Sequence, residues 1–133
     1  MADSGTDAAV AGVGTDIVEV SRIKSLLDKY GEDFVKRTFT AAEAAYCRSR
    51  ANPELHFAAR FAAKEAMAKA LGTGFDGNIT LKSVSIENDP DGAPIAVLDA
   101  SALSKLKSAG AKKMLVSISH IKDFAQAFAV ASK

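Results

Sequence analysis

The stretch Phe57-Ala-Ala-Arg-Phe-Ala-Ala-Lys-Glu-Ala-Met-Ala-Lys-Ala-Leu71 decides the fold expected for this chain. Projected at about 100° per residue, it forms a helix that is apolar on nearly all sides, because alanine, phenylalanine and methionine fill most positions. A helix with such a surface is buried or lies between partners. The sequence therefore predicts a long central helix over 53–71, with Asn52 as N-cap, Pro53 in the first turn and Gly72 at its end.

Four charged side chains interrupt this apolar surface. Arg60 and Lys64 form one pair a turn apart, and Glu65 and Lys69 form a second pair roughly 140° further round the helix. These could be two surface ion pairs, each contributing about 0.3–0.5 kcal/mol. Alternatively they are enclosed by the apolar surface and need compensating partners, which a bound metal and phosphates would supply.

A metal would need a second carboxylate besides Glu65, and Asp16 is the candidate. It ends the predicted strand Val10-Ala-Gly-Val-Gly-Thr-Asp16, whose glycines let the backbone pass close to another element. Capping of a helix is the alternative role for Asp16. Magnesium prefers one or two carboxylates and fills its other positions with water and phosphate oxygens. The pair therefore favours a magnesium–phosphate site over zinc, and manganese would suit the same ligands.

Helices and strands are expected in mixed order along the rest of the chain. The predicted strands cover 10–18, 81–88, 95–98, 114–119 and 124–130, and the predicted helices cover 21–30, 40–50 and 100–109. Thr40 and Glu43 have capping-box spacing, and Asp99 can cap the last helix. This order, with a hairpin in its middle, favours an α+β fold over a doubly wound parallel sheet. We expect one domain over 10–133, preceded by a disordered extension over 1–9.

Composition limits the classes of partner. The 133 residues are 48% hydrophobic and 25% charged, which suits one domain with its own core. The net charge of +1 argues against broad nucleic-acid binding. No apolar run reaches the ~20 residues of a membrane span, and the acidic N-terminus does not resemble a signal peptide. With a single cysteine, Cys47, these features predict a cytoplasmic protein that does not bind membranes.

Three motifs occur in order along the chain. They are Val13-Gly-Thr-Asp-Ile-Val-Glu-Val-Ser-Arg-Ile23, Arg60-Phe-Ala-Ala-Lys-Glu-Ala66 with Lys69-Ala-Leu-Gly72, and Ser117-Ile-Ser-His120. Together they resemble the bacterial holo-[acyl-carrier-protein] synthases of the 4′-phosphopantetheinyl transferase superfamily. The resemblance spans about residues 10–131, and its Lys-Glu-Ala helix is the most specific part. The short chain matches the single-unit type of the superfamily.

The resemblance implies a small antiparallel sheet packed with the long central helix, in a homotrimer with active sites at the subunit interfaces. It also implies a reaction. A serine hydroxyl of apo acyl carrier protein attacks the β-phosphorus of coenzyme A, 3′,5′-ADP leaves, and the carrier receives the 4′-phosphopantetheine arm for fatty acid biosynthesis. Two alternatives are a non-catalytic trimeric module that binds coenzyme A or a nucleotide, and a structural oligomer whose alanine-rich helix only packs.

The resemblance also implies roles for the charged residues. Family members hold magnesium against the pyrophosphate with carboxylates at the positions of Asp16 and Glu65. Lys69 would add a positive charge, and Arg60 would bind another phosphate, such as the 3′-phosphate. Lys64 would contact phosphate or steer the serine proton. A water on the metal, Glu65 and Lys64 are all candidates for the general base.

Further residues bind the cofactor or the carrier in this interpretation. His120 lies where the family places a phosphate-contacting histidine, although a local hydrogen bond is the alternative. The resemblance assigns no role to His56. The turn with Gly92 and Pro94 resembles a loop that lies against the nucleotide from the neighbouring subunit. Gly72 is the remaining cofactor-binding candidate.

A basic segment suggests where an acidic carrier would dock. Residues 20–50 carry seven basic and four acidic side chains, and such a segment is either a solvated face or a dock for an acidic partner. Arg22 aligns with the carrier-docking arginine of the family. Lys24 and Lys29 lie near it on the same predicted helix.

Overall fold

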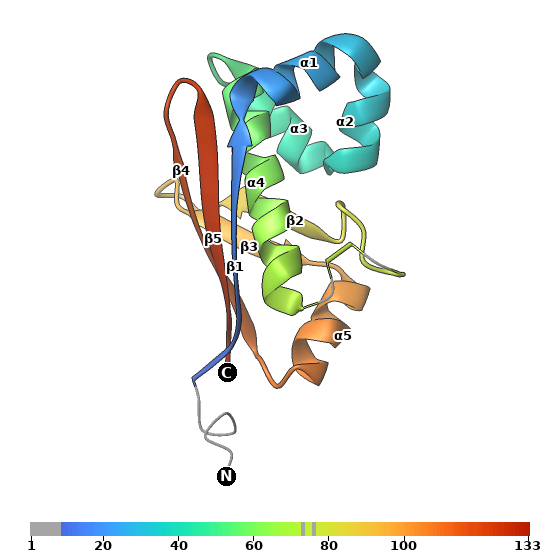
Figure 1. The fold of residues 1–133 in the computed structure, drawn as a ribbon, viewed down its shortest axis with the longest axis vertical. Helices are drawn as coiled ribbons and strands as arrows, with labels where there is room; N and C mark the ends of the chain where they lie inside the picture. Colours follow the sequence, from blue (N-terminus) through green and yellow to red (C-terminus); the bar gives the residue numbers. More distant parts are fainter. Residues whose placement is uncertain (1–8, 73, 76) are drawn as a thin grey trace.

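The computed structural model describes residues 9–72, 74–75 and 77–133. Its centre is α4 (Pro53–Leu71), which lies against one face of a three-stranded antiparallel sheet (Figure 1). The order of strands in this sheet is β1 (Val10–Glu19), β5 (Phe124–Ser132) and β4 (Lys113–His120). The expected α+β fold, with a small antiparallel sheet on a long helix, is confirmed.

The other elements surround the rest of α4. Helices α1 (Val20–Tyr30), α2 (Glu32–Thr38) and α3 (Ala41–Arg48) gather at one end of it, and α5 (Ala100–Ser108) lies near the other (Figure 1). Strands β2 (Val84–Asn88) and β3 (Pro94–Leu98) form a separate antiparallel hairpin. Thus α4 has neighbours on almost every side, as its apolar surface predicts.

Two glycines allow β1 to touch α4 directly. A side-chain carbon on Gly12 would lie 2.1 Å from the carbonyl oxygen of Ala70, and one on Gly14 would lie 2.0 Å from that of Ala66. Real carbon atoms do not approach an oxygen so closely, so only glycine fits at either position. Asp16 faces the same side of the strand two residues later, and the contact therefore brings its carboxylate to the helix.

The two faces of the three-stranded sheet differ in character. Strand β5 turns small side chains toward α4, namely the buried Ala125, Ala127, Ala129 and Ala131. The opposite face carries large apolar side chains that are exposed in the single chain: Val13, Ile17, Leu115, Phe124 and Phe128. We call these five residues the outer apolar face. Exposed apolar surface of this kind marks an interaction site in many proteins.

Most local sequence signals are confirmed. Thr40 and Glu43 form the capping box at the start of α3, and the Asp99 carboxylate accepts a hydrogen bond from the Ala102 amide at 2.9 Å. The predicted strand over 81–88 begins late, at Val84, because a turn precedes it. Asn52 is the N-cap residue of α4, but its side chain makes no capping hydrogen bond.

Two predictions concern the ends and the surface of the chain. The disordered extension predicted over 1–9 lies outside the described residues except for Ala9, whose carbonyl oxygen accepts a hydrogen bond from the Lys133 amide at 2.9 Å. Among the described residues, no helix has both the length and the apolarity needed to cross a membrane.

Candidate functional site

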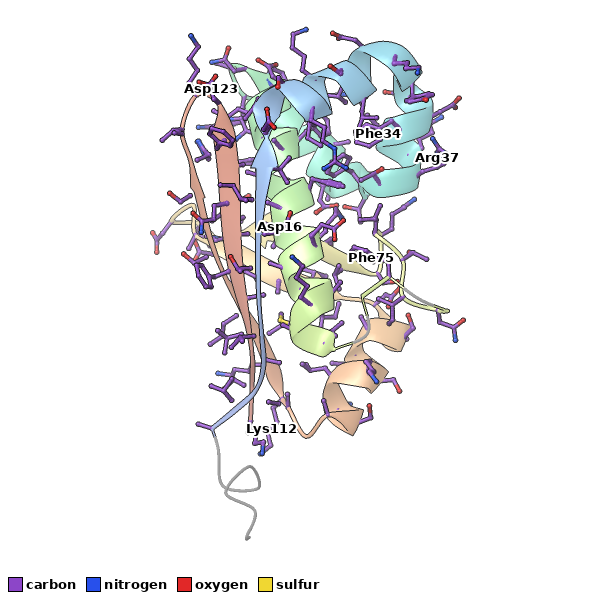
Figure 2. The ribbon with its side chains drawn as sticks, viewed as in Figure 1. Asp16, Phe34, Arg37, Phe75, Lys112 and Asp123 are labelled. Atoms are coloured by element: carbon purple, nitrogen blue, oxygen red, sulfur yellow. The ribbon has the colours of Figure 1, made fainter. Side chains whose placement is uncertain are left out.

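Asp16, Glu65 and Lys69 form a charged group between β1 and α4, which we call the carboxylate site (Asp16 in Figure 2). The Lys69 ammonium donates to the Thr15 carbonyl oxygen at 2.9 Å and lies 3.5 Å from the Asp16 carboxylate. Burial raises the pKa of Glu65, and the negative charge of Asp16 raises it further. Asp16 therefore lies near enough to Glu65 for the two negative charges to interact.

The carboxylate site fits a hard divalent cation. Two mutually repelling carboxylates supply oxygen ligands, and a cation between them would relieve their repulsion. Within the described part of the chain, no three His, Cys, Asp or Glu side chains group together as a metal cage. Magnesium, which takes much of its coordination from water and substrate phosphate, suits such an open pair better than zinc does.

A second group of residues forms a cavity of about 150 Å³, which we call the Arg60 pocket. It brings together residues from α3, α4, the β2–β3 hairpin and β4. Its walls are Tyr46, His56, Ala59, Arg60, Asn88, Gly92, Pro94, Ile118 and His120. Four sequence-predicted cofactor residues thus share one pocket within a single chain: Arg60, Gly92, Pro94 and His120.

Arg60 is held rigidly and retains bonding capacity. Its side chain is nearly buried, its guanidinium lies 4.1 Å from the centre of the Tyr46 ring, and one terminal nitrogen donates to the Asn88 side-chain oxygen at 2.5 Å. Its buried Nε atom has no hydrogen-bond partner among the described residues. The guanidinium of Arg60, which lines this small pocket, suits an anion such as phosphate.

Sequence reasoning missed three polar residues of this pocket, Tyr46, His56 and Asn88. Asn88 accepts from Arg60 and donates to the Gly92 carbonyl oxygen at 3.0 Å, which ties the guanidinium to the hairpin turn. Tyr46 and His56 contact each other with ring centres 5.9 Å apart. No local pattern marks these residues, because packing between distant segments brings them together.

Lys64 does not lie in either group, and the structure corrects its expected role. Its ammonium is fully buried and donates to the Glu43 carboxylate at 2.6 Å, the Leu81 carbonyl oxygen at 2.9 Å and the Val84 carbonyl oxygen at 3.0 Å. All three protons are therefore used inside the protein. Lys64 holds α3, α4 and the start of β2 together, and it is not available to contact phosphate or take the serine proton.

The carboxylate site and the Arg60 pocket lie on opposite sides of α4. Nine residues separate Arg60 from Lys69, which corresponds to a rotation of about 180° and a rise of about 13 Å. In the sheet, Asp16 is on one edge strand, β1, and His120 is on the other, β4. The chain therefore carries two separate groups of candidate site residues.

Of the remaining candidates, Arg22 lies near the carboxylate site. The Arg22 guanidinium lies 5.8 Å from the Phe61 ring centre, and its charge lowers the pKa of Glu65, in opposition to burial and Asp16. Lys24 forms an exposed ion pair with Asp28 at 2.9 Å. Gly72 ends α4 in a left-handed conformation, and its amide donates to the Lys69 carbonyl oxygen at 3.0 Å.

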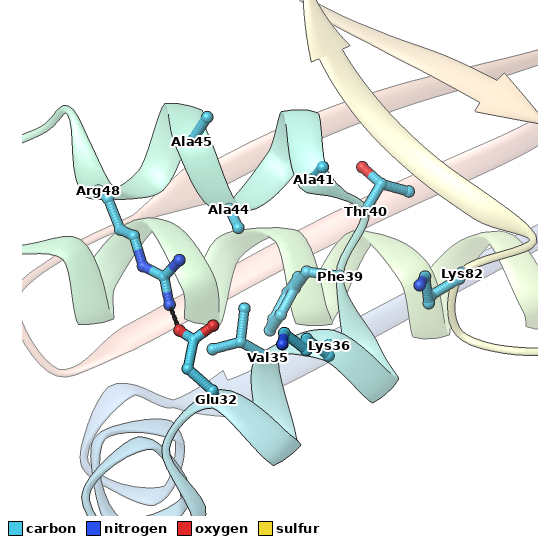
Figure 3. A pocket seen from close by; sticks show the side chains of 10 residues that line it. All are labelled: Glu32, Val35, Lys36, Phe39, Thr40, Ala41, Ala44, Ala45, Arg48 and Lys82. Carbon is cyan, nitrogen blue, oxygen red and sulfur yellow. Dashed lines mark hydrogen bonds and ion pairs between the residues drawn. The ribbon is translucent and has the colours of Figure 1, made fainter.

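Lys29 and a further hollow belong neither to the carboxylate site nor to the Arg60 pocket. The Lys29 ammonium lies 5.2 Å from the Tyr30 ring centre at the end of α1. The hollow, of about 310 Å³, opens between α2 and α3, with Phe39 in its wall and an ion pair between Glu32 and Arg48 at its edge (Figure 3). It contains none of the sequence-predicted site residues.

Comparison with known proteins agrees with this geometry. Residues 12–129 match the family model of the 4′-phosphopantetheinyl transferase superfamily. The chain is 47% identical to a holo-[acyl-carrier-protein] synthase of Protochlamydia amoebophila over 119 residues, which cover 90% of this chain and 95% of that protein. A second such synthase, from Syntrophus aciditrophicus, is 41% identical, with 91% and 94% covered.

Solved structures show the same fold. The holo-[acyl-carrier-protein] synthase of Neisseria meningitidis superimposes with a TM-score of 0.84 at 39% identity, covering 93% of this chain and 99% of that one. The Helicobacter pylori synthase, solved in complex with coenzyme A, gives a TM-score of 0.80 at 28% identity, with 90% and 99% covered. The chain therefore belongs to the holo-[acyl-carrier-protein] synthases of the 4′-phosphopantetheinyl transferase superfamily.

Proposed function

We propose that this chain, as a single domain over 10–133, transfers the 4′-phosphopantetheine arm of coenzyme A to a serine of apo acyl carrier protein and releases 3′,5′-ADP. The observation that carries the proposal is the presence of two half-sites, an open pair of carboxylates and an arginine–histidine pocket. A diphosphate and a separate phosphate monoester, which coenzyme A contains, suit these two half-sites. The reaction would take place in the cytoplasm and supply carriers for fatty acid biosynthesis.

Asp16 and Glu65 would hold Mg²⁺, or Mn²⁺ in its place, at the diphosphate. When bound, the ion would offset the charge of the diphosphate and of the leaving phosphate. Lys69 would add its positive charge from the next turn of α4, where it already lies beside Asp16. Phosphoryl transfer depends chiefly on such positioning and charge stabilisation, and these three side chains are suited to both. Gly72 would keep the chain close to the cofactor where α4 ends.

Arg60 and His120 would bind the 3′-phosphate of coenzyme A. The buried Arg60 has an unused N–H, and its planar guanidinium suits phosphate oxygens. Gly92 and Pro94 line the same pocket and would contact the nucleotide through backbone and apolar atoms. Bonds from Asn88 to both Arg60 and Gly92 support this arrangement, because they hold guanidinium and turn in fixed relation.

The active assembly would be a homotrimer. One molecule of coenzyme A cannot easily reach around α4 to both half-sites of a single chain, so the pocket of one copy would meet the carboxylate site of the next. The outer apolar face offers surface for such contacts, with Val13 and Ile17 each more than 60% exposed in the isolated chain. Active sites would therefore lie at subunit interfaces, completed by two chains.

Arg22 would dock the acidic carrier protein next to the carboxylate site. Its guanidinium packs on Phe61 of α4, one turn before Glu65, so a carrier held there would present its serine near the diphosphate. Lys24 and Lys29 would extend this basic surface along α1. Contacts of this kind mainly accelerate encounter and weaken with salt.

One experiment tests the transfer itself. The protein is incubated with coenzyme A, Mg²⁺ and apo acyl carrier protein, and the carrier is weighed by mass spectrometry; we expect it to gain the mass of one phosphopantetheine arm. Asp16→Ala and Glu65→Ala should lower the rate by orders of magnitude without dissociating the assembly. Binding of coenzyme A without any adduct would support the non-catalytic module. If Glu65→Ala left the rate of transfer unchanged, the result would support the structural oligomer.

A further inference from the structure

Both histidines of the chain meet in the Arg60 pocket. His56 comes from the first turns of α4 and His120 from the end of β4, and their ring centres lie 5.6 Å apart in an edge-to-face arrangement. Among the described residues, no hydrogen bond engages a ring nitrogen of either side chain. The unused nitrogens of two imidazoles and a buried arginine therefore line one pocket, where together they could bind an anionic group.

We propose that His56 is a further phosphate-binding residue of this pocket, and that it takes up a proton when the phosphate monoester of coenzyme A binds. Coenzyme A and its product 3′,5′-ADP would then bind more tightly as the pH falls through the neutral range. This inference rests on the proposed function, since it assumes that the nucleotide end of coenzyme A occupies the pocket.

The charges around His56 explain why the proton arrives with the ligand. Burial lowers the pKa of His56 in the free protein, and the neighbouring positive groups lower it further. The groups that face the ring are His120 on β4, Arg60 and Glu54 on α4, Arg50 after α3, and the neutral Tyr46 on α3. Only Glu54 favours the charged imidazole. The free pocket therefore holds His56 neutral at neutral pH.

A bound phosphate monoester reverses this balance. It brings close to two negative charges near neutral pH, and its oxygens can accept the N–H bonds that the pocket leaves unused. An opposite charge within a few ångströms raises the pKa of an imidazole, so the ligand would stabilise the protonated ring. Because binding and protonation are linked, the affinity gains up to about tenfold per pH unit for each proton taken up.

Proton NMR gives a direct test, because the only two histidine Hε1 signals come from the residues in question. The pKa of each imidazole is measured in the whole protein with and without 3′,5′-ADP, and His56→Phe assigns the signals. We expect 3′,5′-ADP to raise the pKa of His56 by about one unit or more. A His56 titration that 3′,5′-ADP leaves unchanged would overturn the inference.

Binding measurements separate this role from mere packing. Coenzyme A is titrated calorimetrically into the wild type, His56→Phe and His56→Gln at about pH 6.5 and about pH 8.5, a range that brackets the protonation of histidine. The wild type should gain at least about threefold more affinity at the lower pH than either variant does, and should take up more protons. Dephospho-coenzyme A, which lacks the monoester, should give the same small pH effect with all three proteins.

The outcomes distinguish the inference from the proposed function. If both variants bind coenzyme A with the pH dependence and proton uptake of the wild type, the role of His56 is wrong while the transfer reaction stands. If the wild type binds dephospho-coenzyme A as tightly as coenzyme A at both pH values, the pocket does not hold the monoester and the inference falls with that assignment. If no arm is transferred to the carrier, the proposed function itself fails.

Discussion

The backbone of Gly14 lies directly against the backbone of Ala66. A side-chain carbon at position 14 would stand 2.0 Å from the Ala66 carbonyl oxygen and 2.9 Å from the Ala70 nitrogen. Neither atom belongs to a side chain that could move aside. This contact sets the distance between β1 and α4, and with it the distance between Asp16 and Glu65.

Gly14→Ala should therefore destabilise the protein strongly. The added methyl group would push the strand away from the helix, and such overpacking costs about 1–3 kcal/mol or more where backbone must shift. Urea unfolding measures the loss. Thr15→Ala is the matched control, because Thr15 is the next residue on the strand and points away from α4. Equal stability of the two variants would contradict the contact.

The buried pair of Lys64 and Glu43 gives a second prediction. Lys64→Met leaves the Glu43 carboxylate buried without a countercharge, and breaking such a pair costs about 3–5 kcal/mol. Adding Glu43→Gln removes that charge and keeps one side-chain oxygen, which can accept from the Thr40 amide or the Ile86 amide but not from both in their present positions. We expect the double variant to recover part of the loss in a double-mutant cycle. Additive losses would show that the two side chains do not act as a pair.

Glu65→Gln should stabilise the metal-free protein at neutral pH. The pKa of Glu65 is raised above 4.5 in the folded state by burial and by Asp16, so the folded chain binds this proton more tightly than the unfolded chain does. Its contribution to the free energy of unfolding therefore falls as the pH rises through the window above 4.5. Glutamine stays neutral and avoids this loss.

Thermal unfolding in the presence of a chelator measures the difference. The Glu65→Gln variant should melt about 1–3 °C above the wild type near pH 7 and level with it near pH 4. Added Mg²⁺ should raise the melting temperature of the wild type more than that of the variant, since the variant lacks one of the two carboxylates. If the variant were less stable than the wild type at pH 7 without metal, the repulsion between the Asp16 and Glu65 carboxylates would be contradicted.

Cys47 should be unreactive in the folded protein. Burial raises the pKa of its thiol to about 12, so almost no thiolate, the reactive form, exists near neutral pH. We expect iodoacetamide to leave the native protein unmodified over hours and to alkylate it fully in denaturant. Mass spectrometry of the intact chain reads the result, and rapid labelling without denaturant would contradict the buried position.

Arg22→Ala should weaken the binding of acyl carrier protein more than the binding of coenzyme A. Because Arg22 lies on α1 beside the carboxylate site, its loss should raise the KM for acyl carrier protein several-fold and leave the KM for coenzyme A nearly unchanged. The difference should shrink at high ionic strength. Lys107→Ala, which removes an exposed positive charge on α5 outside this basic surface, is the comparison and should leave both KM values nearly unchanged. Equal changes in both KM values would contradict the proposed role of Arg22 in docking the carrier.

Local signals predicted most of the fold. The capping box of Thr40 and Glu43 and the glycine after Leu71 placed α3 and the end of α4, because caps act within one turn of the chain. The sequence did not predict α2 (Glu32–Thr38), which follows α1 after Gly31 alone and is only seven residues long. The apolar residues of so short a helix complete too few turns to show its period.

The candidate site was predictable where residue type and spacing carried the chemistry. Asp16, Glu65 and Lys69 meet as expected, because the two glycines of β1 and the alanines of α4 encode a close contact. The partner of Lys64 was not predictable, because the sequence predicts only a capping role for Glu43. In the structure, Glu43 performs that role and forms the ion pair at once. Burial depends on segments that are distant in sequence, so spacing alone cannot reveal it.

The placement of Arg60 and Lys69 on opposite sides of α4 has a genetic consequence. In the proposed homotrimer, a polypeptide that has lost its carboxylates could still supply an intact pocket to a neighbouring subunit, and one that has lost its pocket could supply its carboxylates. Two inactive alleles, Asp16→Ala and Arg60→Ala, would then restore partial function when expressed in the same cell. Complementation of this kind would also limit the loss of activity that one defective allele causes in assemblies of mixed subunits.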